Sequence, residues 1–399
     1  MSLKKTNIEI AIDLHKAGRL AEAETIYLKL IRDRQTDADA LHFLGLLRMH
    51  QGRRPAAIEL MQRSLKFAPN NAHAWNNLGN LMQAEQDEEG AEQAYIRATN
   101  LAPRMAEAWF NLGILFRRKR KPEEALRSFR AVLDSNPRFS GAYESLGLLL
   151  YRMGRNDHAA DVYCKWLEVE PDHPVARHMY AATSGQSVPA RADNRYVAKV
   201  FDGFASSFDE SLKNLDYAAP QLLSAALAER IDFGHGNLDV LDAGCGTGLC
   251  GLLLRSSAKT LVGVDLSAGM LAKARARKVY DELVEAELCA LMRSRPAAFD
   301  VVNCADTLCY FGELGEVAGA ARCCLRPGGH FGFTVEAAAS DAAEPFKIQA
   351  HGRFGHSASY VRSVLQDAGF RDVERESVVL RKERGEDVAG HLVIGRLLV

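Results

Sequence analysis

The stretch LDVLDAGCGTGLCGLLL, residues 238–254, places four glycines within eight residues, between an apolar run and a leucine-rich segment. The run that precedes the glycines predicts a short buried strand, and the leucines after them predict the start of a helix. A glycine-rich turn from a strand into a helix exposes backbone N–H groups at the positive end of the helix dipole. Glycines also permit tight turning and close approach by a ligand. We therefore predict that this turn binds a nucleotide-like ligand.

The composition is typical of an ordinary globular protein with more than one domain. The chain has 399 residues, of which 25% are charged and 47% hydrophobic, and its formal net charge is -1. This balance gives no reason to expect a nucleic acid or a membrane as partner. No apolar run approaches the roughly 18 residues of a membrane span, and the N-terminal segment lacks the apolar core of a signal peptide. We therefore expect a cytoplasmic protein.

The cysteines predict neither a disulfide framework nor a zinc site. Seven of the eight lie between Cys245 and Cys324, and none forms a C-x-x-C pair, which is typical of reduced, mostly buried thiols. No spacing of His, Asp or Glu indicates a metal site either, so no metal is expected. Cys245 lies inside the glycine turn, where we interpret it as a small residue that fits; a nucleophilic role is the alternative.

A period of 34 residues runs through the first half of the chain. Gly45, Gly79, Gly113 and Gly147 follow this step, as do sets of leucines, alanines, aromatic residues and prolines. The pattern W-x-x-L-G, then Ala, then Tyr or Phe, then Pro resembles the tetratricopeptide repeat (TPR), a helix-turn-helix unit of this length. The resemblance implies a solenoid of about five stacked repeats with a capping helix. We place this domain at residues 1–183 and a polar linker at residues 184–195.

The resemblance also implies a concave face lined by the first helix of each repeat. Asn77 and Asn111 occupy equivalent positions there, and Asn80 lies on the same face as Asn77. An amide side chain both donates and accepts hydrogen bonds, which suits an extended peptide backbone. We therefore expect a protein or peptide partner on this face, with ordinary surface polarity as the alternative. The oligomeric state stays open.

Strand and helix patterns alternate in the second half of the chain. The strands are expected near residues 239–242, 260–265, 299–303, 330–336, 373–380 and 391–398. Alternation of strands and helices predicts a mostly parallel sheet with helices on both faces. The last two segments are expected to pair as an antiparallel hairpin at one edge. The predicted fold is thus an all-α solenoid followed by an α/β, Rossmann-like domain over residues 196–399.

The glycine turn belongs to a longer string, D-A-G-C-G-T-G, in which Asp242 precedes the first glycine. This string resembles motif I of the class I S-adenosylmethionine methyltransferases, and VGVDLSAGML and LRPGGHFGF at later strands add to the resemblance. A dinucleotide fingerprint, G-x-G-x-x-G followed by Asp265, is the weaker alternative because it does not require Asp242. With its repeats, the chain resembles bacterial class I methyltransferases that carry N-terminal TPR repeats. This implies a mostly parallel seven-stranded sheet with an antiparallel edge hairpin.

The same resemblance implies which residues bind S-adenosylmethionine. They are Asp242, Gly244, Cys245, Gly246, Gly248, Asp265, Leu266, Met270, Glu287, Leu288, Phe204 and Phe208. The glycines let the backbone pass close to the methionine part, and Asp242 lies beneath its amino group. Asp265 holds the two ribose hydroxyls, since a carboxylate accepts two hydrogen bonds at once. Leu266 and Leu288 enclose the adenine, and Glu287 accepts from its amine.

Phe204 and Phe208 are expected to cover the cofactor from the preceding helix. The alternative is an apolar stripe that packs on the sheet.

Methyl transfer depends mainly on alignment and on exclusion of water, so no fixed triad is expected. Candidates for a general base are Tyr310, His351 and His356, and Arg353 offers a guanidinium for a carboxylate. Structural histidines are the alternative reading.

We expect a methyltransferase whose repeats recruit a protein or carrier-bound acceptor. The alternatives are a methyltransferase for small carboxylates or amines that uses its repeats for oligomerisation, a TPR scaffold with a non-catalytic fold, and a nicotinamide-dependent oxidoreductase.

Overall fold

The computed structural model describes residues 6–213, 215–231, 236–338, 344–383 and 385–398. The chain forms two compact units, Met1–Met153 and Gly154–Val399. The described part of the first unit is helical, and the second unit begins with two further helices of the repeat region before the α/β domain. The all-α region followed by an α/β domain confirms the predicted fold class.

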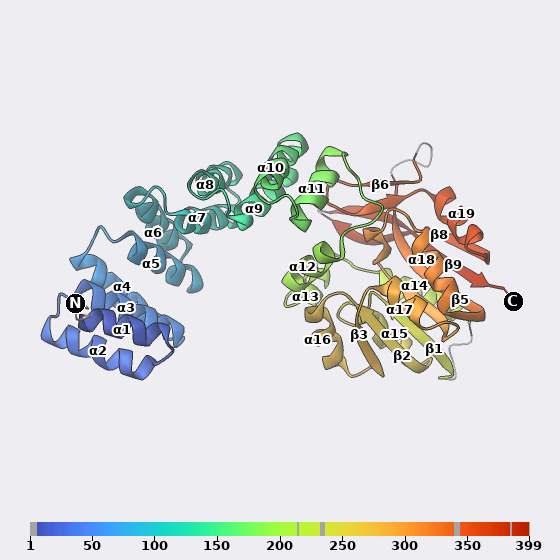
Figure 1. Cartoon of the computed structure of the whole chain (residues 1–399), viewed down its shortest axis with the longest axis horizontal. Helices are drawn as coiled ribbons and strands as arrows, with labels where there is room; N and C mark the ends of the chain where they lie inside the picture. The colour runs from blue at the N-terminus through green and yellow to red at the C-terminus, as the bar shows by residue number, and fades with distance from the viewer. Residues whose placement is uncertain (1–5, 214, 232–235, 339–343, 384, 399) are drawn as a thin grey trace, which may run out of the picture. The chain divides into compact units, whose positions relative to one another are not determined.

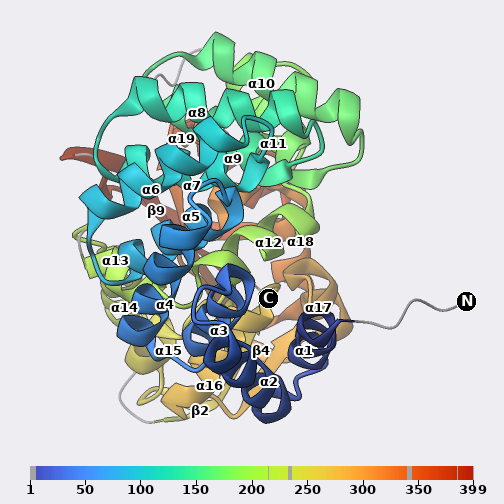
Figure 2. The ribbon, with the colours of Figure 1, turned by 90° about the vertical axis from the view of Figure 1, so that its left-hand side faces the viewer.

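The repeat helices follow one another in pairs along the chain (Figures 1 and 2). In the first unit they are α1 (Asn7–Lys16), α2 (Leu20–Asp33), α3 (Ala38–His50), α4 (Arg54–Phe67), α5 (Ala72–Ala84), α6 (Glu88–Leu101), α7 (Ala106–Arg118), α8 (Pro122–Ser135) and α9 (Ser140–Arg152). The second unit adds α10 (Asn156–Val169) and α11 (Pro174–Ser184).

Glycine is required where the two helices of a repeat meet. A Cβ atom added at Gly79 would lie 2.6 Å from a ring carbon of Tyr95, and one at Gly113 would lie 2.7 Å from a ring carbon of Phe129. Both distances are shorter than van der Waals contact, so any side chain would force the helices apart. The repeating glycine and the repeating aromatic residue are therefore partners in one helix contact.

The asparagines of the first helices connect neighbouring repeats. The side-chain amide of Asn111 donates to the Oδ1 atoms of Asn76 and Asn80, at 3.0 Å each. Nδ2 of Asn77 lies 3.1 Å from Nε2 of His42 in the preceding repeat. These side chains thus form hydrogen bonds within the solenoid itself.

One sheet organises the α/β domain (Figure 1). Its described strands are β1 (Leu238–Ala243), β2 (Ala258–Asp265), β3 (Glu282–Glu285), β4 (Phe299–Cys304), β5 (Leu325–Ala337), β6 (Phe346–Ile348), β7 (Phe354–His356), β8 (Phe370–Glu383) and β9 (Glu386–Leu397). The order is β3-β2-β1-β4-β5-β7-β6, with β9 paired to both β5 and β8.

The first five strands are parallel, and β8 and β9 form an antiparallel hairpin beside β5. These seven strands confirm the predicted architecture. The short strands β6 and β7 are additional. Glu336 of β5 pairs with Gly355 of β7 and with Gly390 of β9, so β7 and β9 lie on opposite sides of β5.

Helices cover both faces of the sheet, because alternate residues of each strand point to opposite sides. The helices of this domain are α12 (Asn194–Phe204), α13 (Phe208–Lys213), α14 (Ala219–Ala228), α15 (Leu249–Leu254), α16 (Ala268–Arg277), α17 (Leu288–Ser294), the 3-10 helix η2 (Leu308–Tyr310), α18 (Gly315–Cys324) and α19 (Ala358–Asp367). In β1, Leu241 belongs to the core under α17, α18 and α19, whereas Val240 belongs to the core under α14 and α15.

Among the described residues, no helix has both the length and the apolar character needed to cross a membrane.

Candidate functional site

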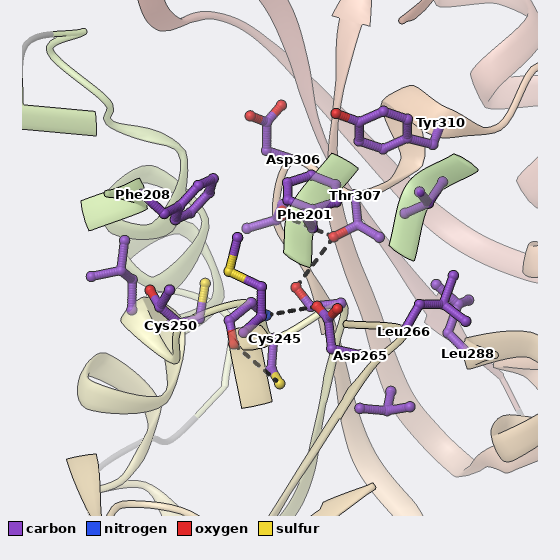
Figure 3. Close-up of a pocket in the computed structure, with 18 of the residues that line it drawn as sticks. Phe201, Phe208, Cys245, Cys250, Asp265, Leu266, Leu288, Asp306, Thr307 and Tyr310 are labelled. Atoms are coloured by element: carbon purple, nitrogen blue, oxygen red, sulfur yellow. Dashed lines mark hydrogen bonds between the residues drawn. The ribbon is translucent and has the colours of Figure 1, made fainter. Parts of the chain in front are cut away.

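A pocket opens where the parallel strands end (Figure 3). It is lined by residues at or directly after the ends of β3, β2, β1 and β4, which are neighbours in the sheet in this order. These lining residues are Ala286, Glu287 and Leu288, then Asp265 and Leu266, then Gly244, Cys245, Gly246 and Thr247, then Ala305, Asp306 and Thr307. From β1 the strands are added toward one edge of the sheet, as β2 and β3, and from β4 toward the other edge. Open α/β sheets bind ligands at such a switch point, here between β1 and β4.

The glycine turn forms the centre of this pocket. Gly244, Gly246 and Gly248 have φ angles of 75°, 53° and 87°, in the left-handed region that favours glycine. A Cβ atom at Gly244 would lie 2.2 Å from Oγ1 of Thr307, whereas one at Gly246 would have no atom within 4 Å. Gly244 is therefore needed for packing against Thr307, which follows β4, and Gly246 keeps the pocket side of the turn open.

Asp265 ends β2 and projects among the lining residues (Figure 3). Its Oδ2 accepts from the backbone N–H of Gly246 and its Oδ1 from that of Ser267, at 2.9 Å each. Burial raises the pKa of Asp265, although these hydrogen bonds oppose the shift. Because each carboxylate oxygen has two lone pairs, the side chain is held in place and keeps acceptor capacity for a ligand.

Asp242 lies below the turn and is not among the described lining residues of the pocket. It is 1% exposed, and its carboxylate accepts from the Tyr280 hydroxyl at 2.6 Å and from Nδ2 of Asn303 at 2.9 Å. Burial raises the pKa of Asp242 to about 6. Tyr280 also fills the space left by Gly248 and Gly251, where an added Cβ would lie 3.0 and 2.4 Å from its side chain. Asp242 thus supports the turn through Tyr280.

Glu287 follows β3 and caps α17. Its carboxylate accepts from the backbone N–H groups of Cys289 at 3.1 Å and Ala290 at 2.8 Å, and from Nη1 of Arg191 at 2.8 Å. Burial alone would raise the pKa of Glu287, but these hydrogen bonds and the guanidinium outweigh it and lower the pKa. The carboxylate is therefore ionised and partly occupied by partners from this chain.

Arg191 belongs to the segment that the sequence predicts as a polar linker, yet this segment is part of the pocket. The carbonyl of Ala190 accepts from the N–H of Gly312, and the N–H of Ala192 donates to the carbonyl of Tyr310, both at 2.8 Å. Ala192 and Asn194 line the pocket. Since the segment has no hydrophobic period and bonds mainly through its backbone, side-chain patterns in the sequence do not reveal it.

Aromatic residues from α12 and α13 also line the pocket. They are Phe201 and Phe208, whose ring centroids lie 6.0 Å apart. Phe204, expected in this role, is instead 55% exposed and lies outside the described lining. The reason is that α12 ends at Phe204 and α13 begins at Phe208, so the helical spacing does not run through all three residues.

The remaining expected cofactor contacts, Cys245, Leu266, Met270 and Leu288, all line the pocket. Burial raises the pKa of the Cys245 thiol well above its usual value. A thiol that stays protonated is a poor nucleophile, which favours the interpretation of Cys245 as a small residue that fits the turn.

A buried ion network forms the wall beyond β4. Arg381 of β8 is 1% exposed and donates from Nη1 to both carboxylate oxygens of Asp306 at 3.2 Å, and from Nε to Glu383 at 2.7 Å. It also bonds Glu336 of β5. Arg353 donates to Glu336 at 3.3 Å and to Glu383 at 2.6 Å. Arg353, Arg381 and Asp306 line the pocket.

The three candidates for a general base lie in different surroundings. Tyr310 lines the pocket, and burial raises its pKa to about 12. His351 lies with Nε2 3.5 Å from Glu336, and His356 is fully buried with Nε2 3.1 Å from the carbonyl of Gly312. Burial lowers the pKa of His356 to about 4. Neither histidine is among the pocket-lining residues that the structure describes.

A parallel sheet with a glycine turn after β1, a carboxylate after β2 and a pocket at the β1/β4 switch point defines a Rossmann-like, nucleotide-binding class of domain. A model of the methyltransferase domain matches residues 241–333, and a tetratricopeptide repeat model matches residues 8–72, 76–126 and 112–176. The chain thus carries tetratricopeptide repeats and a methyltransferase domain, consistent with a TPR plus class I methyltransferase.

Curated methyltransferases are similar to part of the chain. A malonyl-[acyl-carrier protein] O-methyltransferase of Pseudescherichia vulneris is 32% identical over 37% of this chain and 56% of its own length. The human methyltransferase-like protein 27 is 35% identical over 26% of this chain and 42% of its own length. The chain therefore spans about half the length of these relatives. Among solved structures, the chain is similar to the crystal structure of MamA, at 25% identity over 41% of this chain and 95% of that chain, with a TM-score of 0.38.

Proposed function

We propose that the chain is an S-adenosylmethionine-dependent methyltransferase and that the pocket along β3, β2, β1 and β4 holds this cofactor. The observation that carries the proposal is the alignment of Glu287, Asp265 and the glycine turn along one pocket, in the order of the strands. The match of the methyltransferase domain to this part of the chain supports it.

The lining residues fit the chemistry of an adenosyl sulfonium. Asp265 is positioned to hold the ribose hydroxyls, and Leu266 with Leu288 offers apolar surface for the adenine. Gly246 leaves open space where any other residue would place a Cβ atom. Glu287 is engaged by Arg191, so it serves the adenine amine only through its remaining lone pairs. Phe201 and Phe208 exclude water from the same pocket.

When bound, the cofactor supplies an electrophilic methyl group: the acceptor's lone pair forms a bond to the methyl carbon while the carbon–sulfur electron pair returns to sulfur. The residues of this chain contribute alignment and a dry pocket. The glycine turn and Asp265 hold the donor at β1 and β2, which leaves the wall beyond β4 for the acceptor.

Isothermal titration of the pure protein with S-adenosylmethionine tests the proposal. Asp265→Ala removes a carboxylate expected to accept two hydrogen bonds, each worth roughly tenfold or more in affinity because the acceptor is charged. We expect a loss of about a hundredfold. Asp372→Asn changes an exposed aspartate of β8 and serves as control. If wild-type protein shows no binding of S-adenosylmethionine in the titration, the proposal is wrong. If Asp265→Ala binds with unchanged affinity, Asp265 does not contribute to cofactor binding.

We further propose that the repeats recruit a protein or carrier-bound acceptor. Relatives named as O-methyltransferases of malonyl-[acyl-carrier protein] support a carrier-bound group. A small free carboxylate or amine, with the repeats used for assembly, is the second candidate. Transfer of labelled methyl groups in a cell lysate distinguishes the two, since the label travels either with protein or with small solutes.

Full-length variants on the concave face then test recruitment. Asn77→Ala with Asn111→Ala should reduce transfer to a macromolecular acceptor without changing the affinity for the cofactor. A truncated protein without the first unit should retain all residues from Gly154 onward, because Gly154–Val399 is one compact unit. A cut at the predicted linker would damage the pocket, to which Arg191 and Ala192 belong.

A further inference from the structure

We propose that Asp306 is the catalytic residue that receives the acceptor's proton, and that the acceptor presents an N–H or O–H group rather than a carboxylate. The inference rests on the proposed function, because it assumes that the acceptor binds at the side of the pocket beyond β4. Three independent features of the structure support it: the backbone of Asp306, the charge of the wall around it, and the positions of the other candidates.

The backbone holds Asp306 in an unusual conformation. The residue lies two positions after the end of β4 with φ 51°, which L residues other than asparagine and aspartate rarely adopt. Its N–H donates to Oγ1 of Thr334 at 2.8 Å. Aspartate tolerates this region, and the bond to Thr334 of β5 fixes the backbone that carries the Asp306 carboxylate. Asp306 and Tyr310 are both among the lining residues labelled in Figure 3.

The charges in the wall favour a proton donor over an anion. In the described part of the chain, the network has two guanidinium groups, of Arg353 and Arg381, against three carboxylates, of Asp306, Glu336 and Glu383. Of these five groups, Asp306, Arg353 and Arg381 are among the lining residues, whereas Glu336 and Glu383 lie behind them. A carboxylate acceptor would add a further negative charge to a wall that already has an excess of one. An N–H or O–H group instead complements the carboxylate of Asp306, which lines the pocket.

The other candidates cannot take up a proton at this position. The two histidines lie outside the described lining, and Tyr310 is protonated at neutral pH because burial raises its pKa to about 12. Burial also raises the pKa of Asp306, against the effect of Arg381, and this moves the carboxylate toward the range useful for proton transfer.

The step balances in protons and electrons. When the acceptor's lone pair has formed the bond to the methyl carbon, the acceptor atom carries one positive charge and its original proton. That proton passes to a carboxylate oxygen of Asp306, and the acceptor leaves as a neutral methylated amine or ether. Asp306 returns its proton to solvent when the product departs.

Two cofactor analogues test the position of Asp306 without any acceptor. S-adenosylhomocysteine lacks the methyl group, whereas sinefungin has an amine where the transferable methyl group would be. If Asp306 faces this point, the ammonium of sinefungin pairs with its carboxylate. Asp306→Asn, which tolerates the same backbone, should then weaken sinefungin roughly ten- to a hundredfold in isothermal titration and S-adenosylhomocysteine less than about threefold.

Asp372→Asn is the matched control, because Asp372 is an exposed aspartate with φ 49°. It should bind both analogues like wild type. Equal weakening of both analogues by Asp306→Asn, or weakening of neither, overturns the inference while leaving the proposed function intact. Failure of wild type to bind either analogue overturns the proposed function itself.

The chemical stability of the transferred label tests the acceptor class. Labelled products from the lysate assay are treated with mild alkali, which hydrolyses methyl esters to volatile methanol and leaves N-methyl groups and ethers intact. We expect the label to be retained. Release as methanol identifies a carboxylate acceptor and overturns the inference.

Discussion

Hydrogen bonds in the repeat region and hydrogen bonds around the pocket join residues at very different separations in the sequence. Asn111 bonds Asn76, 35 residues before it, and the same step of about one repeat recurs along the solenoid. In the pocket, Arg191 bonds Glu287 across 96 residues, and Arg381 bonds Asp306 across 75. A substitution in the solenoid therefore disturbs one repeat and its neighbours, whereas one in the pocket wall disturbs several strands at once.

The largest expected effect is in the wall. Arg381→Met removes the guanidinium that bonds Asp306 and leaves Glu336 and Glu383 with Arg353 alone. Removal of one member of a buried ion pair typically costs about 3–5 kcal/mol. We expect this loss of stability in urea denaturation.

The comparison in the repeat unit is Arg48→Met. Arg48 pairs with Glu24 at 2.7 Å, but its side chain retains 13% exposure and that of Glu24 25%. This variant should lose about 1 kcal/mol. Equal losses of unfolding free energy in Arg381→Met and Arg48→Met would contradict the expectation that the pocket wall depends more on its ion pairs than the repeats do.

The second effect compares two glycines with the same φ angle. Gly244 and Gly18 both have φ 75°, but a Cβ atom would meet Thr307 at 2.2 Å in the first case and no atom within 4 Å in the second. Gly18→Ala should cost about 1 kcal/mol for its backbone alone. Gly244→Ala adds a clash and should cost about 3 kcal/mol in total.

Gly244→Ala should also abolish detectable binding of S-adenosylhomocysteine, because the clash displaces the turn. Thermal melting and titration measure the two effects. Binding that survives in Gly244→Ala would show that the turn tolerates displacement from Thr307.

Much of the fold follows from local patterns in the sequence. The 34-residue period predicts the helix pairs, and alternating apolar segments predict the strands around Val240 and Leu261. The residues that line the pocket near the glycine turn, such as Asp265 and Leu266, are adjacent to strand ends and were within reach of the same reasoning.

The wall was not predictable in this way. Arg381 is in a polar edge strand. Its partner Asp306 follows β4 and its partner Glu336 is in β5, so no spacing in the sequence connects the three residues. Arg191 is hidden in a segment without hydrophobic period. Phe201 lines the pocket in place of the predicted Phe204, and no pattern in the sequence marks the break between α12 and α13. These contacts join residues that are far apart in the sequence, and a single sequence does not indicate which distant residues meet in the fold.

A third prediction concerns acid and the repeat unit. Burial lowers the pKa of His42 to about 4, below the value of 6.5 for an exposed histidine. Between these values the unfolded chain binds more protons than the folded chain, so stability is present above pH 6.5 and is lost as the pH falls toward 4. At pH 5.5 the loss is about 1.4 kcal/mol.

Trp75 and Trp109 lie in the repeat unit, so a Trp166→Phe background reports the unfolding of that unit by fluorescence. His42→Gln should flatten the dependence on pH between 6.5 and 5. A slope that persists unchanged in His42→Gln would assign the acid sensitivity to other groups.

The smallest effect tests whether the asparagines are structural, ligand-binding or both. Asn111→Ala removes two hydrogen bonds of 3.0 Å, to Asn76 and Asn80, at a partly buried position. We expect a loss of about 1 kcal/mol in denaturation. If the concave face also binds the acceptor, transfer to a macromolecular acceptor should fall further than this stability loss explains, when measured well below the melting temperature. Transfer at the wild-type rate would show that Asn111 only links neighbouring repeats. The acceptor would then bind to another part of the concave face.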